Sequence, residues 1–257
     1  MTAAGASPPG SGAVVRLLAD TGHSQTAGLV RRLVEMPPGS HVADAVASTE
    51  LWYVLSGSGQ LRLPDEPGQH SARLGPDQGV LLPAGTRYRL TATGPAPMRL
   101  DAVTLPAAIA AQPPNAGSRP FRAASQPAAS AAPVIRRLAE CVVETTGDRR
   151  FRVLFGPDRD CPVATQFVGE IPPGRAPEHS HPYDEVVLII DGQGIAHAGG
   201  TQQPLGPGSC IHLPPGVLHC LENSGPDMLR VLGVFHPADS PAAKLPSPGA
   251  SVQSSAE

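Results

Sequence analysis

The sequence predicts an all-β protein made of two antiparallel β-barrel domains in tandem. The first observation is composition: 28 Gly and 31 Pro among 257 residues exclude a bundle of long helices, because Gly costs backbone entropy and Pro removes a donor. The second is pattern, since short apolar segments alternate with Gly/Pro turns, as in antiparallel sandwiches and barrels. The third is that this pattern occurs twice along the chain.

The two copies are aligned by matching segments: Glu35–Gly39 with Glu170–Gly174, Gly57–Gly59 with Gly192–Gly194, and Leu74–Pro76 with Leu205–Pro207. The first two pairs are 135 residues apart and the third pair is 131 apart, so the second copy is four residues shorter in one loop. Two copies indicate a duplicated domain rather than a solenoid.

The boundaries of the copies follow from a composition change. The Ala-, Pro-, Ser- and Gln-rich segment between them cannot bury enough apolar surface to order itself. We therefore expect a flexible N-terminal tail (1–13), an N-terminal barrel (14–106), a linker (107–133), a C-terminal barrel (134–237) and a flexible C-terminal tail (238–257). In the second copy, 186–190 is apolar at every position, which predicts a strand buried on both faces.

Charge and composition exclude several classes of protein. The net charge of −3 comes without the basic surface that nucleic acid or an anionic membrane requires. The sequence has no apolar run long enough to span a membrane, and residues 1–12 lack the regions of a secretory signal. Four Cys without a CxxC pair are not a disulfide framework. We expect a reduced, cytoplasmic protein that binds a small molecule, whose apolar strands bury either an interface between the barrels or a homodimer face.

A metal-ligand pattern occurs in the second copy. His179-x-His181-x-x-x-Glu185 leads into the apolar strand, and His219 follows a Pro-Pro-Gly turn. Residues two or four apart share one face of a strand, and a returning hairpin can bring His219 opposite the other three. Three imidazoles and one carboxylate suit a single divalent transition metal, for which iron is favoured and Mn, Ni, Cu, Co or Zn are alternatives.

The same segments resemble the two sequence motifs of the cupin superfamily. Residues 174–192 resemble the first motif with one residue fewer between the first glycine and the first histidine, and 208–223 match the second motif. The resemblance covers both halves, roughly 14–237, and implies a bicupin of two jelly-roll barrels. It also implies that the metal ligands are His179, His181, Glu185 and His219.

The first copy lacks this ligand set. The alignment places Asp44, Val46, Glu50 and Tyr88 at the positions of His179, His181, Glu185 and His219. Two carboxylates, a phenol and a valine do not make a transition-metal site, so we predict a metal-free N-terminal barrel. Its role is either structural support, which we favour, or a regulatory pocket lined by Asp44, Glu50, Trp52 and Tyr88, where Trp52 stacks on a ligand.

Tyr183 and Asp184, between the predicted ligands, are weaker candidates. They either contact a substrate or are solvated loop residues, and we favour the second interpretation. We assign no catalytic residue.

Three functions fit the predicted metal site. The first is a dioxygenase-type oxidoreductase acting on a small oxygen-rich molecule. The second is a non-redox isomerase, decarboxylase, lyase or hydrolase, in which the metal acts as a Lewis acid and another residue moves a proton. The third is a barrel that binds a small ligand without turnover. The fold supports all three, but the sequence offers no outstanding base beyond the ligands and no DNA-binding helix-turn-helix, so we favour the dioxygenase.

Overall fold

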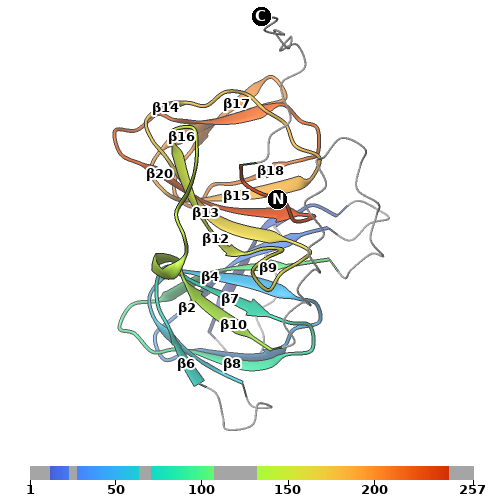
Figure 1. Ribbon diagram of the computed structural model, residues 1–257. Helices are drawn as coiled ribbons and strands as arrows, with labels where there is room; N and C mark the ends of the chain where they lie inside the picture. Colours follow the sequence, from blue (N-terminus) through green and yellow to red (C-terminus); the bar gives the residue numbers. More distant parts are fainter. Residues whose placement is uncertain (1–11, 23–27, 64–70, 107–131, 243–257) are drawn as a thin grey trace, which may run out of the picture.

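The computed structural model in Figure 1 describes residues 12–22, 28–63, 71–106 and 132–242. Within these ranges the regular elements are β-strands, apart from one short 3-10 helix, η1 (Leu138–Glu140). None of the described helical structure has the length and apolarity needed to cross a bilayer. Most of the predicted tails and linker lies outside the described residues.

The first half is a sandwich of a six-stranded and a four-stranded antiparallel sheet. The larger sheet has the order β1-β2-β9-β4-β7-β10 and the smaller one β3-β8-β5-β6. The strands are β1 (Val14–Asp20), β2 (Val30–Met36), β3 (His41–Ala45), β4 (Glu50–Ser56), β5 (Gly59–Arg62), β6 (Ser71–Leu74), β7 (Gln78–Leu82), β8 (Arg87–Ala92), β9 (Met98–Thr104) and β10 (Val134–Arg137). One apolar core, which includes Val54, Leu61 and Leu90, fills the space between the two sheets.

The second half repeats this architecture. Its larger sheet has the order β11-β12-β13-β20-β15-β18 and its smaller sheet β14-β19-β16-β17. The strands are β11 (Glu144–Thr146), β12 (Arg149–Phe155), β13 (Thr165–Ile171), β14 (Gly174–Arg175), β15 (Asp184–Asp191), β16 (Gly194–Ala198), β17 (Thr201–Leu205), β18 (Cys210–Leu213), β19 (His219–Asn223) and β20 (Leu229–His236). The predicted class, all-β with two jelly-roll-like domains in tandem, is confirmed.

The two larger sheets pack against each other in the middle of the molecule, and the smaller sheets lie on the outer sides (Figure 1). The apolar cluster between them includes Leu51 and Val103 of the first half and Val186 and Leu188 of the second. On β15 the alternate residues, such as Val187, face the core of the second half instead. The uninterrupted apolar run is therefore explained by burial on both faces, and it buries an interface within the chain.

A buried ion pair of the first half also contacts the second half. Arg31 on β2 and Asp101 on β9 are both fully buried, with 2.8 Å between Nε and Oδ1. The Nη1 of Arg31 donates a 2.7 Å hydrogen bond across the interface to the carbonyl oxygen of Val186. The hydrogen bond to Val186 therefore fixes how the two larger sheets pack against each other. Removing either partner of the ion pair would leave an uncompensated buried charge.

The strand β10 shows that the halves also share chain. The predicted boundaries place residues 134–137 in the C-terminal barrel, but β10 is hydrogen-bonded to β7 of the first half. The chain therefore adds a strand to the first sheet before it enters the second sandwich.

The repeated Gly-x-Gly turn has the same physical cause in both halves. Gly57 and Gly192 have φ angles of 76° and 88°, a region that side chains rarely adopt. At Gly194 a Cβ atom would lie 2.4 Å from the carbonyl oxygen of Glu222. Glycine is therefore required where β15 turns into β16, and the predicted turn role of these residues agrees with the structure.

Candidate metal centre

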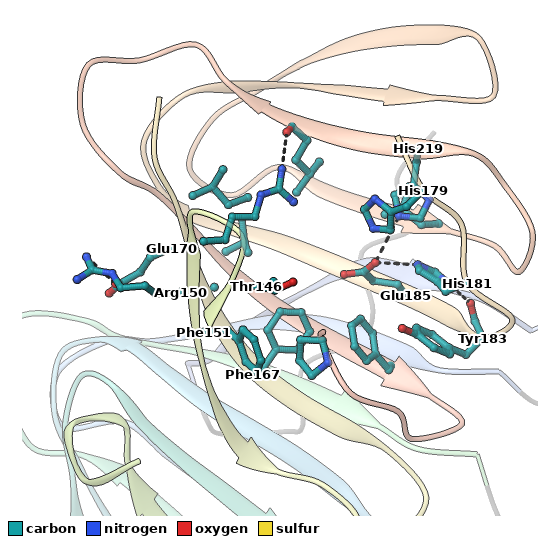
Figure 2. Close-up of a pocket in the computed structure, with 18 residues that line it drawn as sticks. Thr146, Arg150, Phe151, Phe167, Glu170, His179, His181, Tyr183, Glu185 and His219 are labelled. Atoms are coloured by element: carbon teal, nitrogen blue, oxygen red, sulfur yellow. Dashed lines mark hydrogen bonds and ion pairs between the residues drawn. The ribbon is translucent and has the colours of Figure 1, made fainter. Parts of the chain in front are cut away.

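The predicted ligands lie on two neighbouring segments of the second half (Figure 2). One segment leads into β15 and the other is the start of β19. His179 and His181 precede β15, Glu185 lies at its start, and His219 begins β19. The backbone groups of His179 and His219 exchange two hydrogen bonds of 2.9 Å each. These hydrogen bonds hold the segment that carries His179 and His181 next to His219, which lies far away in sequence.

Three of the four side chains form one cluster. The Nε2 of His181 lies 2.9 Å from Oε2 of Glu185, and the Nε2 of His219 lies 3.7 Å from the same oxygen. Their ligand atoms all lie within 4.8 Å of one another, and no other such group occurs in the described ranges. The ring of His179 lies next to this cluster, with centroid distances of 4.6 Å to His219 and 6.4 Å to His181.

Backbone carbonyls orient two of the imidazoles. The Nδ1 of His181 lies 2.8 Å from the Tyr183 carbonyl oxygen, and the Nδ1 of His219 lies 2.8 Å from that of Val217. A carbonyl only accepts, so each Nδ1 donates to its carbonyl and each Nε2 faces Glu185. At 2.9 Å the Nε2 of His181 is also within hydrogen-bond distance of the carboxylate, whereas the buried Nε2 of His219 has no hydrogen-bond partner within the described chain. Two imidazole nitrogens that converge with a carboxylate fit a divalent transition metal, which neutral rings bind through their Nε2 lone pairs.

Burial favours the ligating state of His219. His181 and His219 are each 2% exposed, and burial lowers the pKa of His219 because the imidazolium form loses hydration. Tyr183 stacks on His181 with 4.3 Å between ring centroids and 4° between planes. Tyr183 is only 3% exposed, so the interpretation of this residue as a solvated loop residue is wrong. The aromatic packing around His181 buries it.

A cavity of about 80 Å³ opens onto the cluster. Much of its wall is aromatic, formed by Phe151, Phe167, Tyr183 and Phe235. Its charged residues beyond the cluster include Arg149, Arg150 and Glu170. Figure 2 shows Arg150 and Glu170 together on the side away from the histidines, where their side chains form an ion pair of 3.3 Å.

Comparison with known proteins identifies the segment that carries this site. No curated protein sequence matches the chain. The cupin domain family matches residues 167–235, from β13 into β20, a range that contains all four predicted ligands. This part of the chain is a cupin domain.

Solved structures extend the likeness of the fold to both halves. AerE from Microcystis aeruginosa is 15% identical, with a TM-score of 0.66 over 87% of this chain and 92% of that chain. A deletion mutant of oxalate decarboxylase OxdC from Bacillus subtilis is 15% identical, with a TM-score of 0.69 over 95% and 76%. The putative glyoxylate induced protein from Pseudomonas aeruginosa is 14% identical, with a TM-score of 0.68 over 90% and 83%. At these identities the likeness shows the shared fold alone.

The first half has other side chains at the positions of the cupin ligands. Asp44 and Tyr88 pair on β3 and β8, as His179 and His219 do in the second half, and Val46 is buried in the core. The structure therefore supports the alignment of the two copies residue by residue.

Glu50 accepts hydrogen bonds from Arg32, Trp52 and Thr104 at 2.8, 2.7 and 2.9 Å. The Trp52 ring is 2% exposed and packs edge-on against Tyr88, with centroids 4.9 Å apart. Burial, together with the carboxylates of Glu50 and Asp44, raises the pKa of the Tyr88 phenol. These contacts occupy Trp52 with its own neighbours, which favours structural support over the stacking of a ligand.

Sequence reasoning missed Arg149 and the aromatic wall. Arg149 lies outside both cupin motifs, so no spacing rule marked it. Strand alternation offered a signal, because Arg149, Phe151 and Val153 share one face of β12. That face includes Phe151 in the cavity wall, so it directs Arg149 to the same side.

Proposed function

We propose that this chain is a metal-dependent dioxygenase-type oxidoreductase that acts on a small oxygen-rich molecule. One divalent metal, iron in first place, would be held by His179, His181, Glu185 and His219. The observation that carries the proposal is the convergence of the Nε2 atoms of His181 and His219 on the Glu185 carboxylate in a largely apolar cavity. His179 is included because its backbone is fastened to His219 and its ring lies beside that ring.

The residues of this chain have three tasks in the proposed reaction. The Tyr183 and Val217 carbonyls hold the His181 and His219 rings in one tautomer, which fixes the direction of their lone pairs. The aromatic wall excludes water, which strengthens electrostatic interactions at the reacting atoms. A redox-active ion bound by these residues supplies the electron transfer that allows O₂ to react with an organic molecule.

The remaining titratable groups favour redox chemistry over proton transfer. Glu170, the other carboxylate in the cavity wall, is engaged by Arg150 and Arg152. Burial raises the pKa of the Tyr183 phenol, so this group stays protonated at neutral pH and is not available as a base. An isomerase or lyase needs a base poised beside its substrate, and these two groups do not provide one.

A decarboxylase is the second candidate, and Arg149 favours it. A guanidinium in the cavity wall would attract a carboxylate. Oxalate decarboxylase is one of the proteins with a similar fold, and one of its structures is described in terms of Mn(II) centres. Both candidates use the same metal ligands, so they differ in O₂ consumption and in CO₂ release.

Metal analysis combined with an oxygen electrode tests the proposal. We expect about one equivalent of iron in the untagged protein, its loss in His179→Ala and His219→Ala, and O₂ uptake with diols or diketones. CO₂ release from small acids without net O₂ uptake would replace the dioxygenase by the decarboxylase. A folded protein that retains no divalent metal from metal-replete medium would contradict both, and would leave a barrel that only binds a ligand.

A further inference from the structure

Arg149 lies at the cavity, where the proposed dioxygenase activity gives it no defined role. It is the first residue of β12 and follows a tight turn in which Gly147 has a φ of 63°. Its Nη2 donates to the carbonyl oxygen of Leu221 on β19 at 3.4 Å. The side chain therefore reaches from the larger sheet to the smaller one at the cavity.

Most N–H groups of the Arg149 guanidinium donate no hydrogen bond to the described residues. An arginine side chain carries five N–H donors, and among the described residues the structure gives this one a single, long hydrogen bond. No carboxylate in the described ranges pairs with it, whereas the adjacent Arg150 pairs with Glu170. Removal from water lowers the pKa of Arg149, although the charges of Asp148 and Glu185 oppose this shift.

We propose that Arg149 is the anchor for a carboxylate group of the substrate, and that the substrate is a small carboxylic acid with an apolar body. This inference rests on the proposed metal-dependent function, because it places the acid in the same cavity. The planar fork of the guanidinium matches the two oxygens of a carboxylate. A divalent ion with one carboxylate ligand has a net charge of +1, so the ion and Arg149 together favour an anion.

The placement of the anchor limits the size of the acid. Leu221, whose carbonyl holds Arg149, is two residues from His219 on β19, a spacing of roughly 7 Å along a strand. A molecule of a few carbon atoms spans that distance with its carboxylate on Arg149 and another oxygen toward the histidines. Phe151 and Phe167 in the wall favour an apolar or aryl body between the two ends.

Isothermal titration with 4-hydroxybenzoate, whose ring lies between its carboxylate and its hydroxyl oxygen, and with its neutral amide, 4-hydroxybenzamide, tests the inference under anaerobic conditions. The full-length protein is used as isolated, and its metal content is measured in each sample. We expect the wild type to prefer the acid, and Arg149→Gln to weaken binding of the acid about tenfold or more while the amide is unaffected. Arg137→Gln is the matched control and retains the preference, because the exposed Arg137 side chain pairs with Glu140 outside this cavity.

Several results overturn the inference. One is a wild type that binds acid and amide equally or binds neither, which does not depend on any variant folding. Another is an Arg149→Gln protein with wild-type metal content and an unchanged preference for the acid. If the protein holds no metal but Arg149→Gln still abolishes the preference, the proposed function fails and the carboxylate site stands. If the metal is present and the preference is absent, the reverse holds.

Discussion

Each half has a glutamate at the same position of its larger sheet, but the residues around the two glutamates differ. Glu50 on β4 lies opposite Thr104 on β9, and Glu185 on β15 lies opposite Phe235 on β20, so the strands have the same register. Arg32 contacts Glu50, whereas the aligned residue in the second half is Phe167, a wall residue of the cavity.

This difference shows how a duplicated barrel can keep its fold and change its site. In the first half the positive charge of Arg32 balances the carboxylate within the protein. In the second half Phe167 and Phe235 supply no charge, and the Nε2 atoms of His181 and His219 converge on the carboxylate. In the proposed function a bound cation would balance that carboxylate, so the counter-charge would come from a side chain in one half and from a ligand in the other.

The largest expected effect is on metal content, and it should be confined to the second half. We expect His181→Ala to reduce the bound metal from about one equivalent to near zero, because it removes a donor held in place by the Tyr183 carbonyl. Val46→Ala, at the aligned position of the first half, should leave the metal content unchanged. Elemental analysis of both purified proteins measures this, and equal metal loss in both would contradict the assignment to one half.

The next largest effect concerns the interface. Arg31 and Asp101 of the first half align with Gln166 and Leu232 of the second. We expect Arg31→Met to lower the free energy of unfolding by about 3–5 kcal/mol, because Asp101 remains buried without its partner. The double variant with Asp101→Leu should recover most of the loss. Chemical denaturation measures both, and a double variant no more stable than Arg31→Met would disprove the explanation.

Gln166 offers the matched control at this interface. Its amide is buried without a hydrogen-bond partner among the described residues. We therefore expect Gln166→Leu to be neutral or slightly stabilising in the same denaturation experiment. A loss as large as that of Arg31→Met would show that the amide has a partner outside the described ranges.

A smaller effect separates the two glutamates. Glu50→Gln should destabilise the protein by about 1 kcal/mol, since Arg32 loses its counter-charge but is partly exposed. The same variant should retain its metal, whereas Glu185→Gln should lose it. Thermal unfolding and metal analysis of the pair distinguish these outcomes, and metal loss in Glu50→Gln would place a ligand in the first half.

Much of the fold was predictable because it depends on local rules. The repeated Gly-x-Gly turns, the apolar run on both faces of β15 and the motif spacing each have one structural solution. The pairing of β10 with β7 was not predictable in the same way, because residues 134–137 lie after the linker and their partner is set by tertiary packing. The position of residues 134–137 after the linker favoured their assignment to the second half, although β10 adds a strand to the larger sheet of the first half.

The residues of the site fall into the same two groups: those predictable from local rules and those that depend on tertiary packing. His181, Glu185 and His219 were predictable from motif spacing, although strand alternation does not bring them together, because His181 lies before β15 and His219 belongs to the smaller sheet. Arg149 was not, because its role depends on β12 meeting β19 across two sheets. The burial of Tyr183 was missed for the same reason: Phe235, which packs on it with 4.7 Å between centroids, comes from β20.

The smallest expected effect is the pH dependence of stability that His236 of the second half contributes. His236 aligns with Leu105, and burial lowers the pKa of its imidazole below the ordinary value of 6.5, although Asp184 opposes this shift. As pH falls through 6.5 the unfolded chain therefore takes up the proton first, so stability is constant above that pH and declines below it. His236→Leu, which installs the residue of the first half, should flatten this decline. Urea denaturation of both proteins between pH 7.5 and about 5 measures the difference in slope. Equal slopes would mean that His236 binds its proton equally well in the folded and unfolded chains, and the two halves would then respond alike to acid at this position.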